Sequence, residues 1–124
     1  MNIVISDTVN APIYQQIYEQ IRAQIIRGEL PSGAPLPPIR TVALELRISV
    51  ITVKKAWEML ESRGLITTRV GRGTTVSQVT DRQMEETKAD ILNTRLAQDV
   101  RACRSLGISC DEIIGAVKRH YDSD

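Results

Sequence analysis

Aromatic side chains are scarce in this chain of 124 residues, which has three tyrosines, one tryptophan and no phenylalanine. Because so few rings are present, a hydrophobic core has to be built mainly from isoleucine, leucine and valine. The apolar share of 42% and the charged share of 25% are still those of an ordinary globular protein.

Histidine and cysteine are also scarce, since His120, Cys103 and Cys110 are the sole representatives of the two types. One imidazole and two distant thiols are a poor ligand set for zinc. A single histidine near the C-terminus also leaves no arguable nucleophile–base pair, and there is no glycine-rich phosphate loop. We therefore predict no enzymatic activity, no cofactor and no metal. The two cysteines are interpreted as small buried hydrophobic residues, with a thiol sensor as the alternative.

Long apolar runs are absent as well. No stretch approaches the roughly 18 residues of a membrane span, and the opening MNIVISDTVN lacks the basic and apolar regions of a secretion signal. We expect a cytoplasmic protein with no membrane partner.

Charge is distributed unevenly along the chain. Residues 1–79 hold nine Lys or Arg against six Asp or Glu, a net of +3, whereas residues 80–124 hold seven against nine, a net of −2. Residues 40–72 alone contain seven basic and three acidic side chains. This pattern favours a polyanion partner for the first part and a different role for the second.

The periodicity of the first part predicts three helices. Isoleucine recurs every fourth residue from Ile13 to Ile25, so residues 12–30 are expected to form a helix that Gly28 ends. A proline-rich connector follows, and a short helix is expected from Pro37 or Pro38 through residue 47. The stretch RISVITVKKAWEML at 47–60 is rich in β-branched residues, but its longer period is helical, with Ser49 as the N-cap.

Two β-rich runs, 65–70 and 74–79, surround the glycines of GRG at 71–73 and predict a hairpin. Three helices followed by a hairpin are the elements of a winged helix-turn-helix, whose third helix enters the DNA major groove. Exposed Val50 and Ile51 would then meet thymine methyls, while Lys54 and Lys55 would neutralise phosphates. The alternative is that Val50 and Ile51 pack under the hairpin or against the first helix.

The second part is helical in pattern. Residues 82–106 contain neither Gly nor Pro, and Gly107 is expected to end that helix. Ser109 and Glu112 then form a predicted capping box at the start of a last helix. The predicted fold class is mainly α with a small β-hairpin: a winged helix-turn-helix domain at 1–79, followed by a two-helix dimerisation tail at 80–124.

Four ordered motifs resemble the DNA-binding domain of GntR-type bacterial transcription regulators. They are PIYQQIYEQI at 12–21, IIRGELPSGAPLPPIR at 25–40, ITVKKAWEMLESRGLI at 51–66 and RVGRGTTV at 69–76. The tail, with LGIS at 106–109 and DEII at 111–114, resembles the YtrA-like subfamily, whose members lack a large effector domain and dimerise through two C-terminal helices.

The resemblance implies a set of DNA-contacting residues on the second helix, the recognition helix and the wing. Where relatives often carry Arg or Asn, this chain has Val50, which cannot read guanine bidentately and shifts the expected contacts toward thymine. The predicted DNA-binding residues are Arg40, Ser49, Val50, Ile51, Thr52, Lys54, Lys55, Arg69, Gly71, Arg72 and Gly73.

The resemblance also implies a homodimer that binds a palindromic double-stranded operator and represses a transporter operon. An unidentified small-molecule effector, bound between the tail helices and the DNA-binding domains, is a separate hypothesis based on the reach of the tail. Specific recognition usually needs two half-sites, which a two-fold dimer supplies. The alternatives are a tail that folds back on its own domain, and a protein-interaction adaptor that does not bind DNA specifically. The predicted dimerisation residues are Ile91, Leu92, Leu96, Val100, Ile113, Ile114 and Val117.

Overall fold

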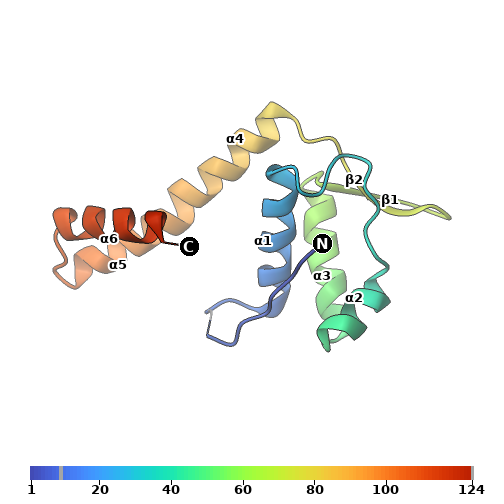
Figure 1. Ribbon diagram of the computed structural model, residues 1–124, viewed down its shortest axis with the longest axis horizontal. Coiled ribbons are helices and arrows are strands. Elements are labelled where there is room, and N and C mark those ends of the chain that lie inside the picture. Colours follow the sequence, from blue (N-terminus) through green and yellow to red (C-terminus); the bar gives the residue numbers. More distant parts are fainter. Residues whose placement is uncertain (9, 124) are drawn as a thin grey trace. The chain divides into compact units, whose positions relative to one another are not determined.

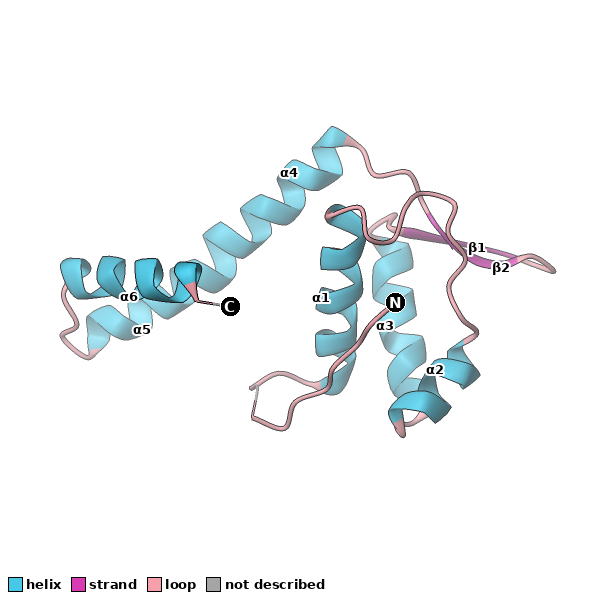
Figure 2. Cartoon of the chain, viewed as in Figure 1, coloured by secondary structure: helices cyan, strands magenta, loops and turns pink. Residues whose placement is uncertain are grey.

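The computed structural model describes residues 1–8 and 10–123 and divides the chain into two compact units, Met1–Thr80 and Asp81–Asp124 (Figure 1). The expected mainly helical fold with a small hairpin is confirmed (Figure 2). The first unit contains α1 (Ile13–Ile26), α2 (Ile39–Leu46), α3 (Val50–Ser62), β1 (Ile66–Arg69) and β2 (Gly73–Val76). The second contains α4 (Asp81–Asp90), the π-helical segment η1 (Ile91–Leu96), α5 (Ala97–Ser105) and α6 (Cys110–Asp122).

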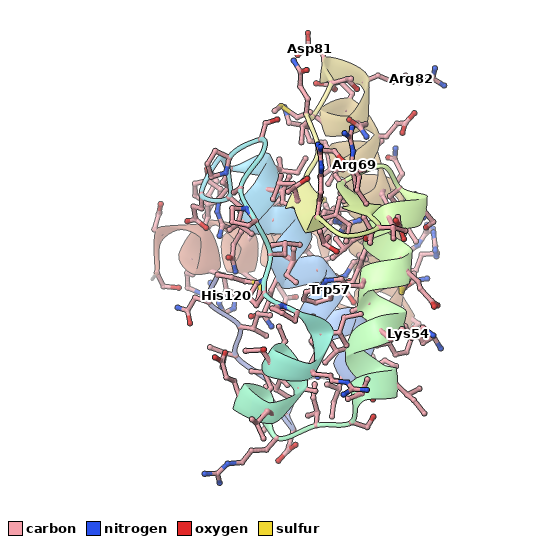
Figure 3. All side chains as sticks on the ribbon, turned by 90° about the vertical axis from the view of Figure 1, so that its right-hand side faces the viewer. Lys54, Trp57, Arg69, Asp81, Arg82 and His120 are labelled. Atoms are coloured by element: carbon pink, nitrogen blue, oxygen red, sulfur yellow. The ribbon has the colours of Figure 1, made fainter. Side chains whose placement is uncertain are left out.

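The core of the first unit is almost entirely aliphatic, as the composition predicts. Ile17 and Ile21 of α1 and Leu60 of α3 have no exposed surface. Trp57 lies on the side of α3 toward α1 (Figure 3) and is only 4% exposed. Burying these side chains, each worth roughly 1.5–3 kcal/mol, fixes α3 against α1 and leaves its opposite side in solvent.

The hairpin has an unexpected third neighbour. β1 and β2 pair antiparallel, with Ile66 opposite Val76 and Arg69 opposite Gly73. The proline-rich connector runs along the other edge of β2, where the Leu36 N–H donates to the Thr74 carbonyl at 2.9 Å and the Val76 N–H donates to the Ala34 carbonyl at 2.9 Å. The connector therefore anchors the hairpin to the segment that precedes α2.

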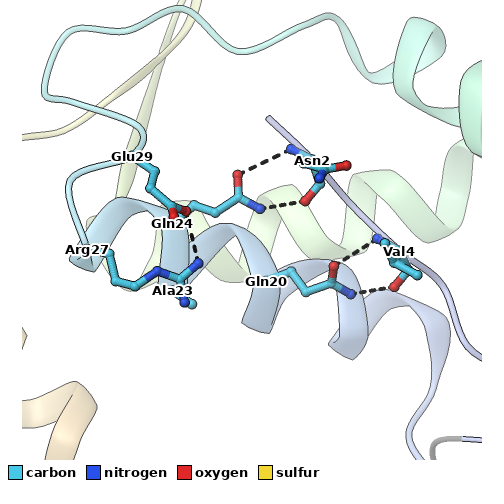
Figure 4. A pocket seen from close by; sticks show the side chains of 7 residues that line it. All are labelled: Asn2, Val4, Gln20, Ala23, Gln24, Arg27 and Glu29. Atoms are coloured by element: carbon cyan, nitrogen blue, oxygen red, sulfur yellow. Dashed lines mark hydrogen bonds and ion pairs between the residues drawn. The ribbon is translucent and has the colours of Figure 1, made fainter. Parts of the chain in front are cut away.

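The N-terminal segment is held on α1 by three glutamines four residues apart. Gln24 accepts from the Asn2 N–H at 3.3 Å and donates to the Asn2 carbonyl at 2.6 Å (Figure 4). Gln20 makes the same pair of bonds with Val4 at 2.9 and 2.7 Å, and Gln16 with Ser6 at 2.9 and 3.1 Å. Four residues of helix and two residues of extended chain have nearly the same length. Successive glutamines on α1 therefore bond to every second residue of the N-terminal segment.

The expected helix over 82–106 is continuous in the structure, but it is not α-helical throughout. The helix starts at Asp81, and six residues in its middle form the π-helical η1, in which the bonding pattern lengthens from i+4 to i+5. That change brings side chains five apart, such as Ile91 and Leu96, toward the same side. The predicted capping box is confirmed: the Ser109 hydroxyl accepts from the Glu112 N–H at 3.2 Å, and Glu112 accepts from the Ser109 N–H at 3.4 Å.

The interpretation of the cysteines as buried residues is wrong. Cys110 is exposed, Cys103 is half-buried, and both are free thiols. The physical reason is that α4, η1, α5 and α6 contain no buried residue among those described, so the tail of one chain has no interior in which to place them. Within the described residues, no helix combines the length and the apolar character needed to cross a membrane.

Candidate nucleic-acid interface

The N-terminus of α3 is capped and exposes aliphatic side chains. The Ser49 hydroxyl accepts from the Thr52 N–H at 3.2 Å and shares a second hydrogen bond with the Thr52 hydroxyl at 2.8 Å. Val50 is 44% exposed and Ile51 is 78% exposed. The segment is therefore a helix and not a strand, and the alternative that Val50 and Ile51 pack under the hairpin or against α1 is wrong.

The two lysines of α3 point in different directions. Lys54 is exposed and extends away from the helices of the first unit (Figure 3). Lys55 instead places its Nζ atom 4.0 Å from the centre of the Tyr14 ring on α1, a cation–π contact. The sequence gives no sign of this difference, because the partner ring lies about forty positions earlier in the chain.

The tip of the hairpin is built by two left-handed glycines. Gly71 has φ of +79° and Gly73 has φ of +77°, a conformation that other residues adopt at a cost. The Arg72 N–H donates to the Arg69 carbonyl at 3.0 Å and closes the turn. Arg69 and Arg72 are both exposed, so the tip carries two cations in solvent.

Arg40 lies in the first turn of α2 and is exposed. Two apolar residues near the candidate contacts are not predicted from the sequence. Leu44 on α2 is 81% exposed, and Val70 at the hairpin tip is fully exposed. The one sequence feature that indicates the exposure of Leu44 is its position on α2, outside the helix face that buries Val42 and Ala43.

The predicted DNA-binding residues thus come from α2, the start of α3 and the hairpin of one compact unit. All are exposed except Thr52, which is half-buried behind Ser49. The surrounding stretch from 40 to 72 holds seven basic side chains against three acidic ones. Such a surface presents cations for phosphates, and hydroxyl and methyl groups for base edges.

The tail carries a second candidate surface. A groove of about 610 Å³ runs between α5 and α6, and its lining is mostly aliphatic, with Leu96, Val100, Ile113 and Val117 among its residues. Six of the seven predicted dimerisation residues are exposed in the single chain, and the seventh is half-buried. The exposed fractions are 42% for Ile91, 57% for Leu92, 42% for Leu96, 38% for Val100, 46% for Ile114 and 51% for Val117, and Ile113 is half-buried.

A hollow of about 540 Å³ beside α1 is a weaker candidate for a ligand-binding site. It is lined by Asn2, Val4, Gln20, Ala23, Gln24, Arg27 and Glu29 (Figure 4). The Arg27 guanidinium is paired with the Glu29 carboxylate at 2.9 Å, and both glutamine amides are bonded to the N-terminal backbone. The polar groups of this hollow therefore bind one another. Among the described residues no cluster of His, Cys, Asp and Glu could hold a metal ion.

Three helices with a capped, exposed third helix, followed by a basic hairpin, define a winged helix-turn-helix DNA-binding protein. Comparison with known proteins identifies the class more closely. The family model described as bacterial regulatory proteins, gntR family, matches residues 13–76. The HTH-type transcriptional repressor YtrA of Bacillus subtilis is 30% identical over 104 residues, which are 84% of this chain and 80% of YtrA.

Comparison with solved structures points to the same family. A GntR family transcriptional regulator from Listeria monocytogenes superposes with a TM-score of 0.73 at 29% identity, covering 93% of this chain and 98% of that one. The DNA-binding domain of AraR, solved in complex with operator ORR3, superposes with a TM-score of 0.52 at 26% identity, covering 62% of this chain and 93% of that one. The chain belongs to the gntR family of bacterial regulatory proteins, as a YtrA-like transcription regulator and not an enzyme.

Proposed function

We propose that the protein is a homodimeric repressor that binds a palindromic operator through α3. The observation that carries the proposal is the pair of exposed aliphatic residues, Val50 and Ile51, directly after the Ser49 cap. Exposed branched side chains are unfavourable in water, and the start of a recognition helix is where they can meet thymine methyls. Arg40, Lys54 and Arg72 contact phosphates and set the orientation of the domain.

The role of Lys55 in this proposal is indirect. Its ammonium group rests on the Tyr14 ring at 4.0 Å, so it helps to fix α3 on α1. Ser49 and Thr52 share one hydrogen bond in which either hydroxyl can be the donor, so one hydroxyl hydrogen of the pair stays available for an acceptor on the DNA. Gly71 and Gly73 let the hairpin backbone approach the duplex closely.

Dimerisation is proposed to occur through the tail. The groove between α5 and α6 and the exposed aliphatic residues of η1 have no cover within the second unit. A second copy of the same tail has matching apolar chemistry, and a two-fold pair would present two α3 helices to two half-sites. Burial of the half-exposed Cys103 would accompany this association, because Cys103 lines the groove.

The cellular setting is proposed on the resemblance to YtrA-like regulators. It comprises a cytoplasmic location, control of a transporter operon and a small-molecule effector. An effector would act by changing the distance between the two α3 helices, because that distance has to match the spacing of the half-sites.

The proposal is tested by selecting bound duplexes from a random pool with the full-length protein. The expected product is an inverted repeat whose half-site centres lie about one or more helical turns apart. Arg40→Ala is expected to lower the slope of log affinity against log salt by about one for each half-site. Selection of a single half-site would contradict the dimer, and the absence of any enriched sequence would favour the protein-interaction adaptor.

A further inference from the structure

Two helix ends in this chain have nearly the same sequence and the same hydrogen bonds. The sequences are LRIS at 46–49, between α2 and α3, and LGIS at 106–109, between α5 and α6. In the first, the Ile48 N–H donates to the Ala43 carbonyl at 3.0 Å; in the second, the Ile108 N–H donates to the Cys103 carbonyl at 3.1 Å. The serine that ends each stretch caps the next helix.

The two ends differ at the residue that turns the chain. Gly107 has φ of +77°, in the left-handed region where glycine has no side chain to strain the backbone. The equivalent residue of the first end is Arg47, with φ of +57°. Among the described residues, Arg47 is the sole residue other than glycine with a positive φ. The geometry of this turn therefore favours glycine, and the chain carries an arginine there at a conformational cost.

Within the described part of the chain, no polar contact of the Arg47 side chain offsets that cost. The Arg47 side chain is exposed, and its guanidinium has no hydrogen bond or ion pair with any residue in the described part of the chain. Its surroundings are those of the candidate interface, since it lies two residues before Ser49 and on the loop that follows the helix of Arg40. The tail end, which is not assigned to DNA, keeps the glycine.

We propose that Arg47 binds a phosphate of the operator backbone and that this contact is the reason for an arginine at a glycine-like position. The proposal rests on the proposed function, because it places the turn before α3 against the duplex. In a helix-turn-helix the first helix crosses the backbone and the second lies in the groove, so the turn between them passes close to phosphates. A guanidinium matches phosphate oxygens bidentately.

The test compares three variants of the full-length protein on one selected operator duplex. Arg47→Gly should raise the unfolding temperature by about 4 °C, because the strain is relieved. The same variant should weaken operator binding roughly tenfold and lower the log–log salt slope by about 0.9 for each half-site. Arg47→Asn, which tolerates the left-handed conformation without charge, should show the same loss of binding. Arg47→Lys should keep the slope of the wild type.

Several results would overturn the proposal. Wild-type affinity and slope in Arg47→Gly would show that no phosphate is bound, and a lower unfolding temperature would show that the arginine stabilises the fold instead. Loss of slope in Arg47→Lys would exclude charge neutralisation as the cause. Arg101→Ala, which removes an exposed arginine from α5, is the control for net charge. If the wild type binds no duplex, the proposed function fails; if the wild type binds and Arg47→Gly binds equally well, this inference alone fails.

Discussion

The two units of the chain treat their apolar residues in opposite ways. The first buries fourteen hydrophobic residues in one core and leaves a smaller set of aliphatic side chains exposed, among them those at the start of α3. The second buries none of the residues described in its helices, although it holds nine leucine, isoleucine and valine residues. This difference supports the proposal that a second copy of the chain covers the apolar side chains of the second unit.

The largest effect is expected from placing charge on the tail. Val100→Glu combined with Val117→Glu should abolish the dimer, because two carboxylates would be buried in an apolar interface. Operator affinity should then fall by roughly 10²–10⁴, the contribution of joining two binding modules. Analytical ultracentrifugation and fluorescence anisotropy measure the two effects. Circular dichroism should show that the first unit stays folded. A stable dimer with wild-type affinity would contradict the proposal that the apolar residues of the tail form the dimer interface.

The next largest effect is expected on the stability of the first unit, when a cavity is made in its core. Leu60 of α3 has no exposed surface, so Leu60→Ala should lower the free energy of unfolding by about 3 kcal/mol. Chemical denaturation of the full-length protein measures it. The matched change on the exposed side of the same unit is Leu44→Ala, which is expected to change stability by less than about 0.5 kcal/mol. Equal costs for the two variants would mean that the assignment of the core is wrong.

The serine caps of the two units are compared by removing each hydroxyl in turn. Ser49→Ala and Ser109→Ala each remove a hydroxyl that accepts from a backbone N–H at 3.2 Å, and each should destabilise its own helix by about 1 kcal/mol. Ser49→Ala should also weaken operator binding, because the cap fixes the start of α3. Hydrogen exchange locates the destabilised helix, and binding lost equally in both variants would show that the effect is not local.

The smallest effects are expected from replacing the two lysines of α3, one of which should change operator binding and the other stability. Lys54→Ala should lower the salt slope of operator binding by about one for each half-site and leave stability unchanged. Lys55→Ala should lower stability by about 0.5–1 kcal/mol, because it loses the contact with Tyr14. Salt titrations and thermal unfolding of both variants test the distinction. The reverse result would assign the phosphate contact to Lys55.

Periodic and capping features of the structure could be predicted from the sequence. Isoleucines four apart predict α1, Ser49 and Ser109 predict two helix starts, and two β-rich runs around Gly71 and Gly73 predict the hairpin. These features depend on residues close together in the chain, so local rules are sufficient.

Features that depend on distant partners could not be predicted. Gln16, Gln20 and Gln24 have the spacing of an ordinary polar helix face until the N-terminal segment lies beside them. The contact between Lys55 and Tyr14 requires α1 and α3 to be packed together. The left-handed backbone of Arg47 has no signal in the sequence either, because arginine is a good helix former and has no turn preference of its own.

The central claim is that the exposed start of α3 meets bases in the major groove, and thymine methyl groups test it most directly. Each thymine of the selected operator is replaced by deoxyuridine, which removes the methyl group, and binding is measured for the wild type and for Ile51→Ala. We predict that one or two replacements in each half-site weaken binding of the wild type and cause no further loss in Ile51→Ala. If every replacement is silent and Ile51→Ala binds as tightly as the wild type, Ile51 does not contact the bases and the account of α3 is contradicted.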